Sequence, residues 1–160
     1  FYFTAMKKLL NREGDYVFIP GIGVRKIENL VSFCIGGGLT WLAIIDDDPE
    51  VGGQDSLKKF DEIKEHVFDG DDSLAKKKIH ILSGVVGIEN MFTTGDLKLV
   101  DQQVNSEADK VKAVGKKRKV LFSKIFFEKV KNGDIKKENL SKTSISNFEK
   151  AFNFIEKNIG

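Results

Sequence analysis

The chain has 160 residues, of which 26 are basic and 24 acidic, so its formal net charge is +2. This composition is typical of a folded globular protein of one domain, or one domain with an appendage, and excludes a disordered chain. The sequence shows no signal peptide and no apolar run of membrane-spanning length, and its single cysteine excludes a disulfide framework. We therefore expect a protein of the reducing cytoplasm without a membrane partner.

The first part of the chain alternates between helical and strand-like patterns. Apolar residues at helical spacing predict one helix over residues 3–10 and another over 27–34. Between them, the run Tyr16–Ile19 predicts a strand that ends at Pro20. The turn from Pro20 to Gly23 leads into the second helix but carries no complete phosphate-binding motif, so we interpret it as a tight turn.

Three consecutive aspartates follow the next predicted strand, Trp41–Ile45. In open α/β sheets, ligands bind beyond the carboxyl ends of the strands, where Asp46, Asp47 and Asp48 would project. Adjacent carboxylates repel one another, and a divalent cation would relieve that repulsion. Alternate residues of an extended chain point to the same side, so Asp46 and Asp48 can share a metal while Asp47 faces away. The alternative is a solvated acidic turn that caps the next helix.

The second part of the chain begins with one more strand and then becomes helical. After another helical stretch, Ile79–Leu82 predicts a short strand. Alternation of strands with helices is typical of parallel sheets, so Glu89, just beyond this strand, should lie at the same edge as Asp46. We expect an α/β core over residues 1–100 and a helical extension packed on it over residues 101–160.

The charged residues are unevenly distributed along the chain. Acidic residues gather around positions 46–72, whereas the segment 110–131 is strongly basic. An acidic site beside a basic flank suits an anionic polymer that is handled through metal ions. A solvated surface would give the same pattern, so the charges alone leave both interpretations open.

The order of the acidic residues is similar to that of a known family. Asp46 and Asp48 match a D-x-D motif at a strand end, Gly52 or Gly53 the glycine that often follows it, and Glu89 a later acidic residue. On these residues the chain resembles a Toprim domain, the metal-binding fold of topoisomerases and primases, and more narrowly the Toprim nuclease of the OLD (overcoming lysogenization defect) family. The resemblance implies an α/β fold whose parallel sheet has about three to four strands with helices on both faces.

This resemblance implies a metal-dependent endonuclease that hydrolyses DNA phosphodiester bonds. Mg²⁺ or Mn²⁺ would be held by Asp46, Asp48 and Glu89. The family's later lysine matches Lys119 best and Lys117 next, and it would stabilise charge on the phosphate in the transition state. The side chains expected to contact flanking phosphates without reading bases are Lys116, Lys117 and Arg118. Family members are usually fused to an ABC-type ATPase, so we expect that partner in the same parent chain, and the resemblance allows a homo-oligomer.

One feature of the family is missing from the sequence. The family has a glutamate at the end of its first strand, and this chain starts at Phe1, where the following helix would begin. We therefore expect a fragment of a longer protein that cleaves DNA poorly on its own. A non-catalytic Toprim-like module for DNA binding or oligomerisation is one alternative. A receiver-like signalling domain is another, although it requires a different order of acidic residues.

Overall fold

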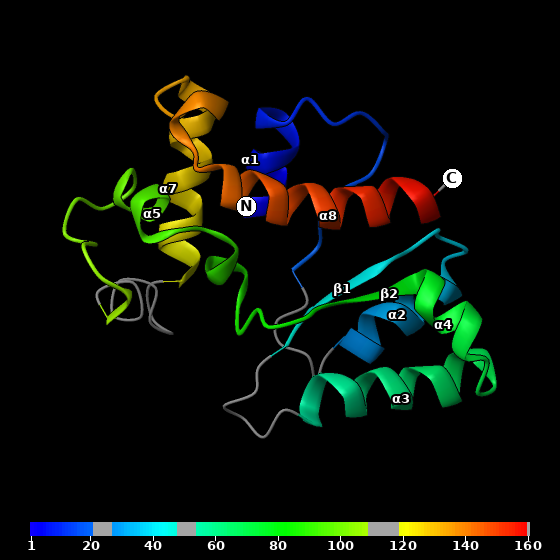
Figure 1. Ribbon diagram of the computed structural model, residues 1–160. Coiled ribbons are helices and arrows are strands. Elements are labelled where there is room, and N and C mark those ends of the chain that lie inside the picture. The colour runs from blue at the N-terminus through cyan, green and yellow to red at the C-terminus, as the bar shows by residue number, and fades with distance from the viewer. Residues whose placement is uncertain (21–26, 48–53, 109–118, 160) are drawn as a thin grey trace. The chain divides into compact units, whose positions relative to one another are not determined.

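The computed structural model describes residues 1–20, 27–47, 54–108 and 119–159 of a mixed α/β protein (Figure 1). These residues form two compact units. Residues 1–18 and 88–152 form the first, which we call the helical unit, and residues 19–87 and 153–160 form the second, the sheet unit. The chain passes between the two units at three points, and none of them falls at residue 100. The boundary that the sequence indicates there, between an α/β core and an extension, stays a prediction.

The sheet unit is built on two parallel strands. Strand β1 (Ala43–Asp46) pairs with β2 (Ile79–Leu82) from Ala43 opposite Ile79 to Asp46 opposite Leu82. Within the described residues the sheet has only these two strands, fewer than the sequence predicts. Strand β2 has the predicted bounds, whereas β1 begins two residues later than predicted and includes Asp46. The parallel direction means that both strands end at the same edge.

One face of this sheet carries the core of the sheet unit. Alternate strand residues point to one side, and on this side they pack against α3 (Gln54–Phe68) and α4 (Asp72–Lys78) (Figure 1). The buried members of this core are Ala43, Ile45, Phe60, Ile63, Ala75 and Ile79. On the opposite face, the ring of His80 stacks on Phe154 near the end of α8 (Lys142–Asn158), at 4.7 Å between ring centroids. Helical residues therefore cover both faces.

A group of charged side chains joins α3 to α2 (Ile27–Gly36). The Nζ atom of Lys59 lies 2.9 Å from Glu28 and also contacts Glu62, and Nδ1 of His66 lies 3.1 Å from Glu28. Hydrogen bonds from Lys59 and then His66 hold the pKa of Glu28 below its ordinary value. Hydrogen bonds to Glu62 and Glu28 raise the pKa of Lys59, whose side chain is buried.

Replacing Lys59 by methionine is expected to destabilise the protein by about 1–2 kcal/mol at neutral pH, because Glu28 and Glu62 lose their shared cation. The contribution of this group should fade as the pH falls through the lowered pKa of Glu28, and again as the pH rises through the raised pKa of Lys59. Urea unfolding at several pH values measures it. Lys64→Met is the matched control on the same helix, since Lys64 forms its ion pairs with the exposed Asp61 and Glu65 of α3. Equal destabilisation of both variants would contradict the prediction.

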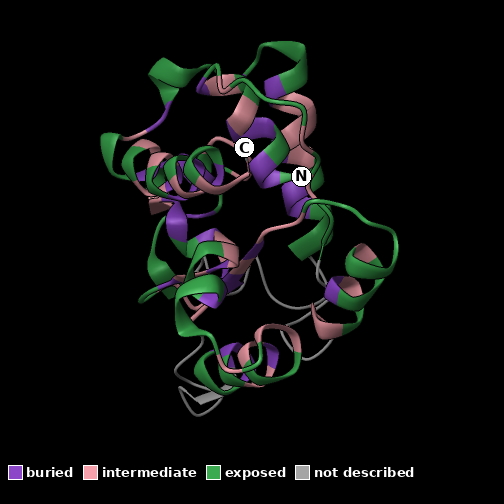
Figure 2. Ribbon diagram, turned by 90° about the vertical axis from the view of Figure 1, so that its right-hand side faces the viewer, coloured by how far each residue is buried: buried purple, intermediate pink, exposed green. Residues whose placement is uncertain are grey.

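The helical unit is held together by aromatic rings. It comprises α1 (Tyr2–Leu9), the 3-10 turn η3 (Ile88–Met91), α5 (Thr94–Lys98), α7 (Lys119–Asn132), the 3-10 turn η4 (Lys137–Asn139) and most of α8. Phe92 lies at the centre, with ring centroids 4.8 Å from Phe148, 5.0 Å from Phe126 and 5.1 Å from Tyr2. Each such pair contributes about 0.5–1.5 kcal/mol beyond the area that it buries. The buried residues of this unit appear in purple in Figure 2.

The predicted strand Tyr16–Ile19 is wrong, since these residues have no regular secondary structure. Its alternating pattern instead reflects the packing of Tyr16 and Phe18. The ring of Phe18 stacks on Phe3 at 5.2 Å and meets Tyr16 edge-on at 5.5 Å, while Val17, between them, is 82% exposed. The segment is thus one-sided, and Phe18 packs on Phe3 of α1 rather than on a neighbouring strand.

The second half of the chain is helical, as predicted. Between residues 101 and 160, the described residues contain α7, η4 and α8 and no strand. Within the described ranges, every helix is too short or too polar to cross a bilayer.

Candidate functional site

The carboxyl ends of β1 and β2 lie at one edge of the sheet unit, and Asp47 joins them. Its backbone N–H donates to the carbonyl of Val85 at 2.8 Å, and its Oδ2 accepts from the backbone N–H of Gly84 at 3.1 Å. Its Oδ1 accepts from the hydroxyl of Ser56 at 3.2 Å, at the start of α3. Gly84 has φ +74°, in the left-handed region where a side chain is strained. The middle aspartate therefore has structural partners on both sides.

The other predicted residues at this edge are only partly described. Asp46 is the last residue of β1 and pairs with Leu82. Asp48, together with Gly52 and Gly53, lies outside the described residues, as does the basic group Lys116, Lys117 and Arg118. The tight turn expected from Pro20 to Gly23 also extends outside them.

Glu89 and Lys119, which the resemblance assigns to one site, form an ion pair in the helical unit. The Nζ atom of Lys119 lies 3.2 Å from Oε2 of Glu89. Glu89 belongs to η3 and is 5% exposed, whereas the side chain of Lys119, the first residue of α7, is 45% exposed. A buried carboxylate thus holds a cation that solvent can reach. An ion pair in such a setting is screened less by salt than one on the open surface.

The segments that carry this pair are fixed by apolar packing. The backbone N–H of Phe92 donates to the carbonyl of Glu89 at 3.1 Å and closes the η3 turn, and the rings of Phe92 and Phe126 meet at 5.0 Å. Phe126 lies two turns after Lys119 on α7, and therefore on nearly the same side of that helix. The packing of these two phenylalanines explains why the acid and the lysine meet.

Sequence reasoning overlooked Tyr2, which packs against both segments. Its ring lies 5.1 Å from Phe92 and 5.6 Å from Phe126, and the residue is 4% exposed. Its hydroxyl is buried and has no hydrogen-bond partner among the described residues. Burial, and secondarily the charge of Glu89, raise the pKa of Tyr2, so the phenol stays protonated. No sequence signal distinguishes this tyrosine from an ordinary core position of the first helix.

A second buried carboxylate, Asp96, also escaped the sequence reasoning. It is 2% exposed and accepts hydrogen bonds from Thr93, Ser141 and Ser144. Thr93 and Asp96 form a capping box at the start of α5, and a T-x-x-D pattern in the sequence could have indicated it. Ser141 immediately precedes α8 and Ser144 lies in its first turn, so this group is structural and joins two helix starts.

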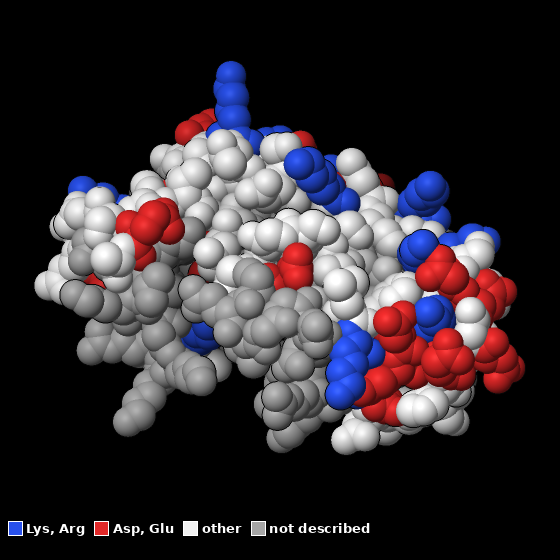
Figure 3. All heavy atoms as spheres, turned by 60° about the horizontal axis from the view of Figure 1, so that its bottom comes forward, with Lys and Arg blue, Asp and Glu red and all other residues white. Residues whose placement is uncertain are grey.

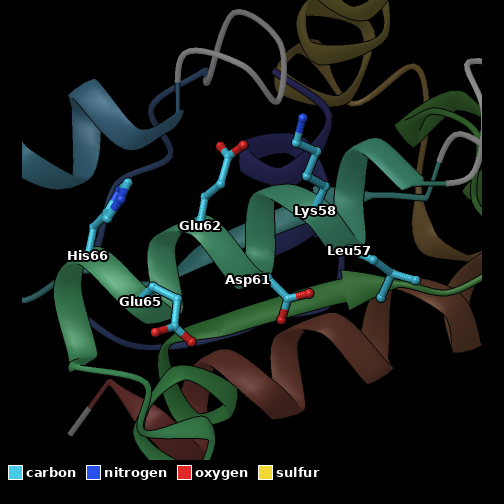
Figure 4. A pocket seen from close by; sticks show the side chains of 6 residues that line it. All are labelled: Leu57, Lys58, Asp61, Glu62, Glu65 and His66. Carbon is cyan, nitrogen blue, oxygen red and sulfur yellow. The ribbon is translucent and has the colours of Figure 1, made fainter.

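The exposed surface of α3 and α4 carries many of the acidic residues of the segment 46–72. Figure 3 shows them interspersed with lysines. Six side chains of α3 line a pocket on its surface: Leu57, Lys58, Asp61, Glu62, Glu65 and His66 (Figure 4). All six come from one helix, and the contact that α2 makes with them is the structural one between Glu28 and His66. We interpret this surface as solvated.

The donor chemistry of the predicted site suits a hard divalent cation. Such ions take carboxylate oxygens, which Asp46 and Glu89 would supply. Within the described ranges, no three His, Cys, Asp or Glu side chains form a group that could hold a metal, and the expected ligand Asp48 lies outside those ranges. Asp46 belongs to the sheet unit and Glu89 to the helical unit, so their convergence stays a prediction.

Comparisons of the chain with models of known families, with curated proteins and with solved structures give no match.

Proposed function

We propose that this chain is the metal-dependent DNA endonuclease domain of a larger, ATPase-linked cytoplasmic protein, similar to the Toprim nucleases of the OLD family. The observation that carries the proposal is the ion pair between Glu89 and Lys119. The resemblance assigns both residues to one site, and the structure has them paired although they lie on separate elements, η3 and α7. A parallel sheet that ends at Asp46 is the second support.

The chemistry assigned to these residues is hydrolysis of a phosphodiester. Asp46, Asp48 and Glu89 would hold Mg²⁺ or Mn²⁺. A bound divalent ion supplies a Lewis acid for the phosphoryl oxygens. Glu89 is well suited to bind a cation because it is buried, and few waters compete for its oxygens.

Lys119 would provide positive charge to the phosphate in the transition state. Its exposed side chain can leave Glu89 and reach a phosphate oxygen that approaches from solvent. An ammonium aimed at developing charge in a partly dry site contributes more there than it would in water. The neighbouring residues Lys116, Lys117 and Arg118 would position DNA through its phosphates, independently of sequence.

Titration calorimetry with Mn²⁺ tests the metal site in this chain. The unmodified chain should give a binding heat, and Asp46→Ala should abolish it. Asp47→Ala is the matched control at the neighbouring position. It should keep the heat but lower the melting temperature, because the N–H of Gly84 and the hydroxyl of Ser56 lose their acceptor. Equal heats from the unmodified chain and Asp46→Ala would refute the proposed site.

The second candidate is a non-catalytic Toprim-like module that binds DNA or oligomerises. The same ion pair favours it in one respect, because Lys119 already neutralises Glu89 without a metal. DNA binding without any Mn²⁺ heat would support this candidate over the nuclease.

A further inference from the structure

The end of α2 exposes apolar side chains in a stretch of the chain that carries no charge. Phe33 is 69% exposed and Leu39, just after the helix, is 52% exposed. Charged residues make up 31% of the whole chain, yet residues 29–45 contain none. Leu57 and Leu74, which are also exposed in the sheet unit, each have charged residues within two positions. An exposed apolar surface of this kind is typical of an interaction site.

Two sides of α2 are occupied by contacts within the sheet unit. Ile27 packs against the core of that unit, and Val31, about one turn later, is buried. Glu28 lies about 100° further around the helix and contacts Lys59 and His66 of α3. These contacts fix the orientation of the helix and leave a third side for other partners.

The third side of α2 is apolar. Leu30, Phe33 and Gly37 follow one another at the spacing of one helical face. The helix ends in a Schellman motif, in which Gly38 has φ +64° and the backbone N–H of Leu39 donates to the carbonyl five residues earlier at 2.9 Å. This turn brings Leu39 back to the helix, since a Cβ at Gly37 would lie 3.5 Å from its Cγ. We call Leu30, Phe33, Gly37 and Leu39 the apolar flank of α2.

We propose that the apolar flank of α2 is the contact surface of a symmetric homodimer, in which it packs on the same flank of a second copy of the chain. A two-fold axis brings a surface against itself, so that a surface with charges of one sign repels its own image. The flank has no charge to repel. Its exposed phenylalanine and leucine would leave water on association, and the burial of apolar surface drives such contacts.

The chemistry of the flank disfavours other occupants. DNA is bound through basic side chains that contact its phosphates, and residues 29–45 contain no lysine or arginine. Helices that lie on a lipid surface usually carry such basic residues beside the apolar ones. Packing of the flank on α3 of another copy would remove water from acids and lysines without giving them partners. A second copy of the flank involves none of these costs.

Sedimentation equilibrium over a range of concentrations tests the dimer. The mass of the unmodified chain should rise from 17.9 kDa towards twice that value as its concentration increases. Phe33→Glu should raise the dissociation constant about 100-fold or more, because the two-fold axis places two carboxylates in an apolar contact. Leu39→Glu, outside the helix, should act in the same direction. Because both side chains are exposed, the variants should melt at the temperature of the unmodified monomer in dilute solution.

Ile35→Glu is the matched control on the same helix. Ile35 is also exposed but lies about 200° around the helix from Phe33, and thus away from the apolar flank. This substitution adds the same charge and should leave the dissociation constant unchanged. Equal weakening by Phe33→Glu and Ile35→Glu would overturn the proposed surface.

Hydrogen exchange on the same samples locates the contact. Amides of residues 30–39 should exchange more slowly at the concentration where the dimer forms, and those of α3 should not change. Added salt should leave the dimer intact, because no charges meet in the contact. A chain that stays monomeric at every concentration, or a dimer that salt dissociates or that protects other residues instead, would overturn the inference. Mn²⁺ binding is measured separately, so the nuclease proposal does not depend on the outcome.

Discussion

Lys119→Ala is expected to lower the rate at which the complete protein nicks supercoiled plasmid in Mn²⁺ by about 100- to 1000-fold, the usual effect of removing one stabilising group from a transition state. DNA binding should weaken far less, because Lys119 is one of several cations proposed to contact the phosphates. The contrast between cleavage and binding is what identifies transition-state stabilisation. Cleavage assays and salt-dependent DNA binding on the same preparations measure both quantities.

Two control variants keep this result interpretable. Lys124→Ala removes another exposed lysine of α7 and should cleave at a rate close to that of the unmodified protein. Lys119→Arg keeps a cation beside Glu89 and should preserve the melting temperature, yet it should recover only part of the rate, because a guanidinium differs from an ammonium in shape and hydration. If Lys119→Ala and Lys124→Ala cut at equal rates, the role assigned to Lys119 is wrong.

Asp96→Ala should produce the largest loss of stability, about 3 kcal/mol or more, because several buried donors lose a shared charged acceptor. The carboxylate of Asp96 accepts from the N–H and hydroxyl of Ser141 at 2.7 Å each and from the hydroxyl of Thr93 at 2.6 Å, and Ser144 also donates to it. These contacts join the start of α5 to the start of α8. Asp134→Ala, which removes an exposed aspartate of the same unit, is the control and should change little.

The pH dependence of unfolding tests the same residue independently. Burial acts to raise the pKa of Asp96, but hydrogen bonds from Ser144, Thr93 and Ser141 outweigh it and hold the pKa below its ordinary value. The folded state therefore binds a proton less readily at this site than the unfolded state does. The contribution of Asp96 is present above the unfolded pKa of about 3.9 and is lost as the pH falls through the folded pKa. Asp96→Asn should flatten the acid limb of the stability curve, and an unchanged limb would contradict the assignment.

Local patterns in the sequence predicted the elements that local interactions determine. Strand β2 has the predicted bounds because its short apolar run is followed at once by Ser83 and Gly84. The run Tyr16–Ile19 has the same local signal, but whether it forms a strand depends on which element lies beside it. No short-range pattern in the sequence decides this, and in the structure Phe18 packs on Phe3 of α1.

Some residues of the site could likewise be predicted from local patterns in the sequence, and others could not. Asp46 and Asp48 are recognisable because they follow a strand and neighbour one another, and Glu89 and Lys119 because their order resembles that of a family. Tyr2 could not be found by such reasoning, and the T-x-x-D pattern indicates Asp96 only as part of a helix cap. The partners of Asp96 lie 45 and 48 residues away, so its burial becomes evident only once α5 and α8 are in contact. Long-range hydrogen bonds of this kind leave no periodic pattern in a sequence.

The hydrogen bonds of Asp47 have a consequence for how such chains diverge. Selection for folding alone would retain an aspartate at position 47, whose two oxygens join β1 to α3 and to the turn after β2, and a glycine at position 84, whose φ of +74° disfavours other residues. If the chain has the proposed nuclease function, a descendant that lost it should keep these two residues while positions 46 and 48 drift. A shared middle aspartate would then report common ancestry, and only its two neighbours would report a shared activity.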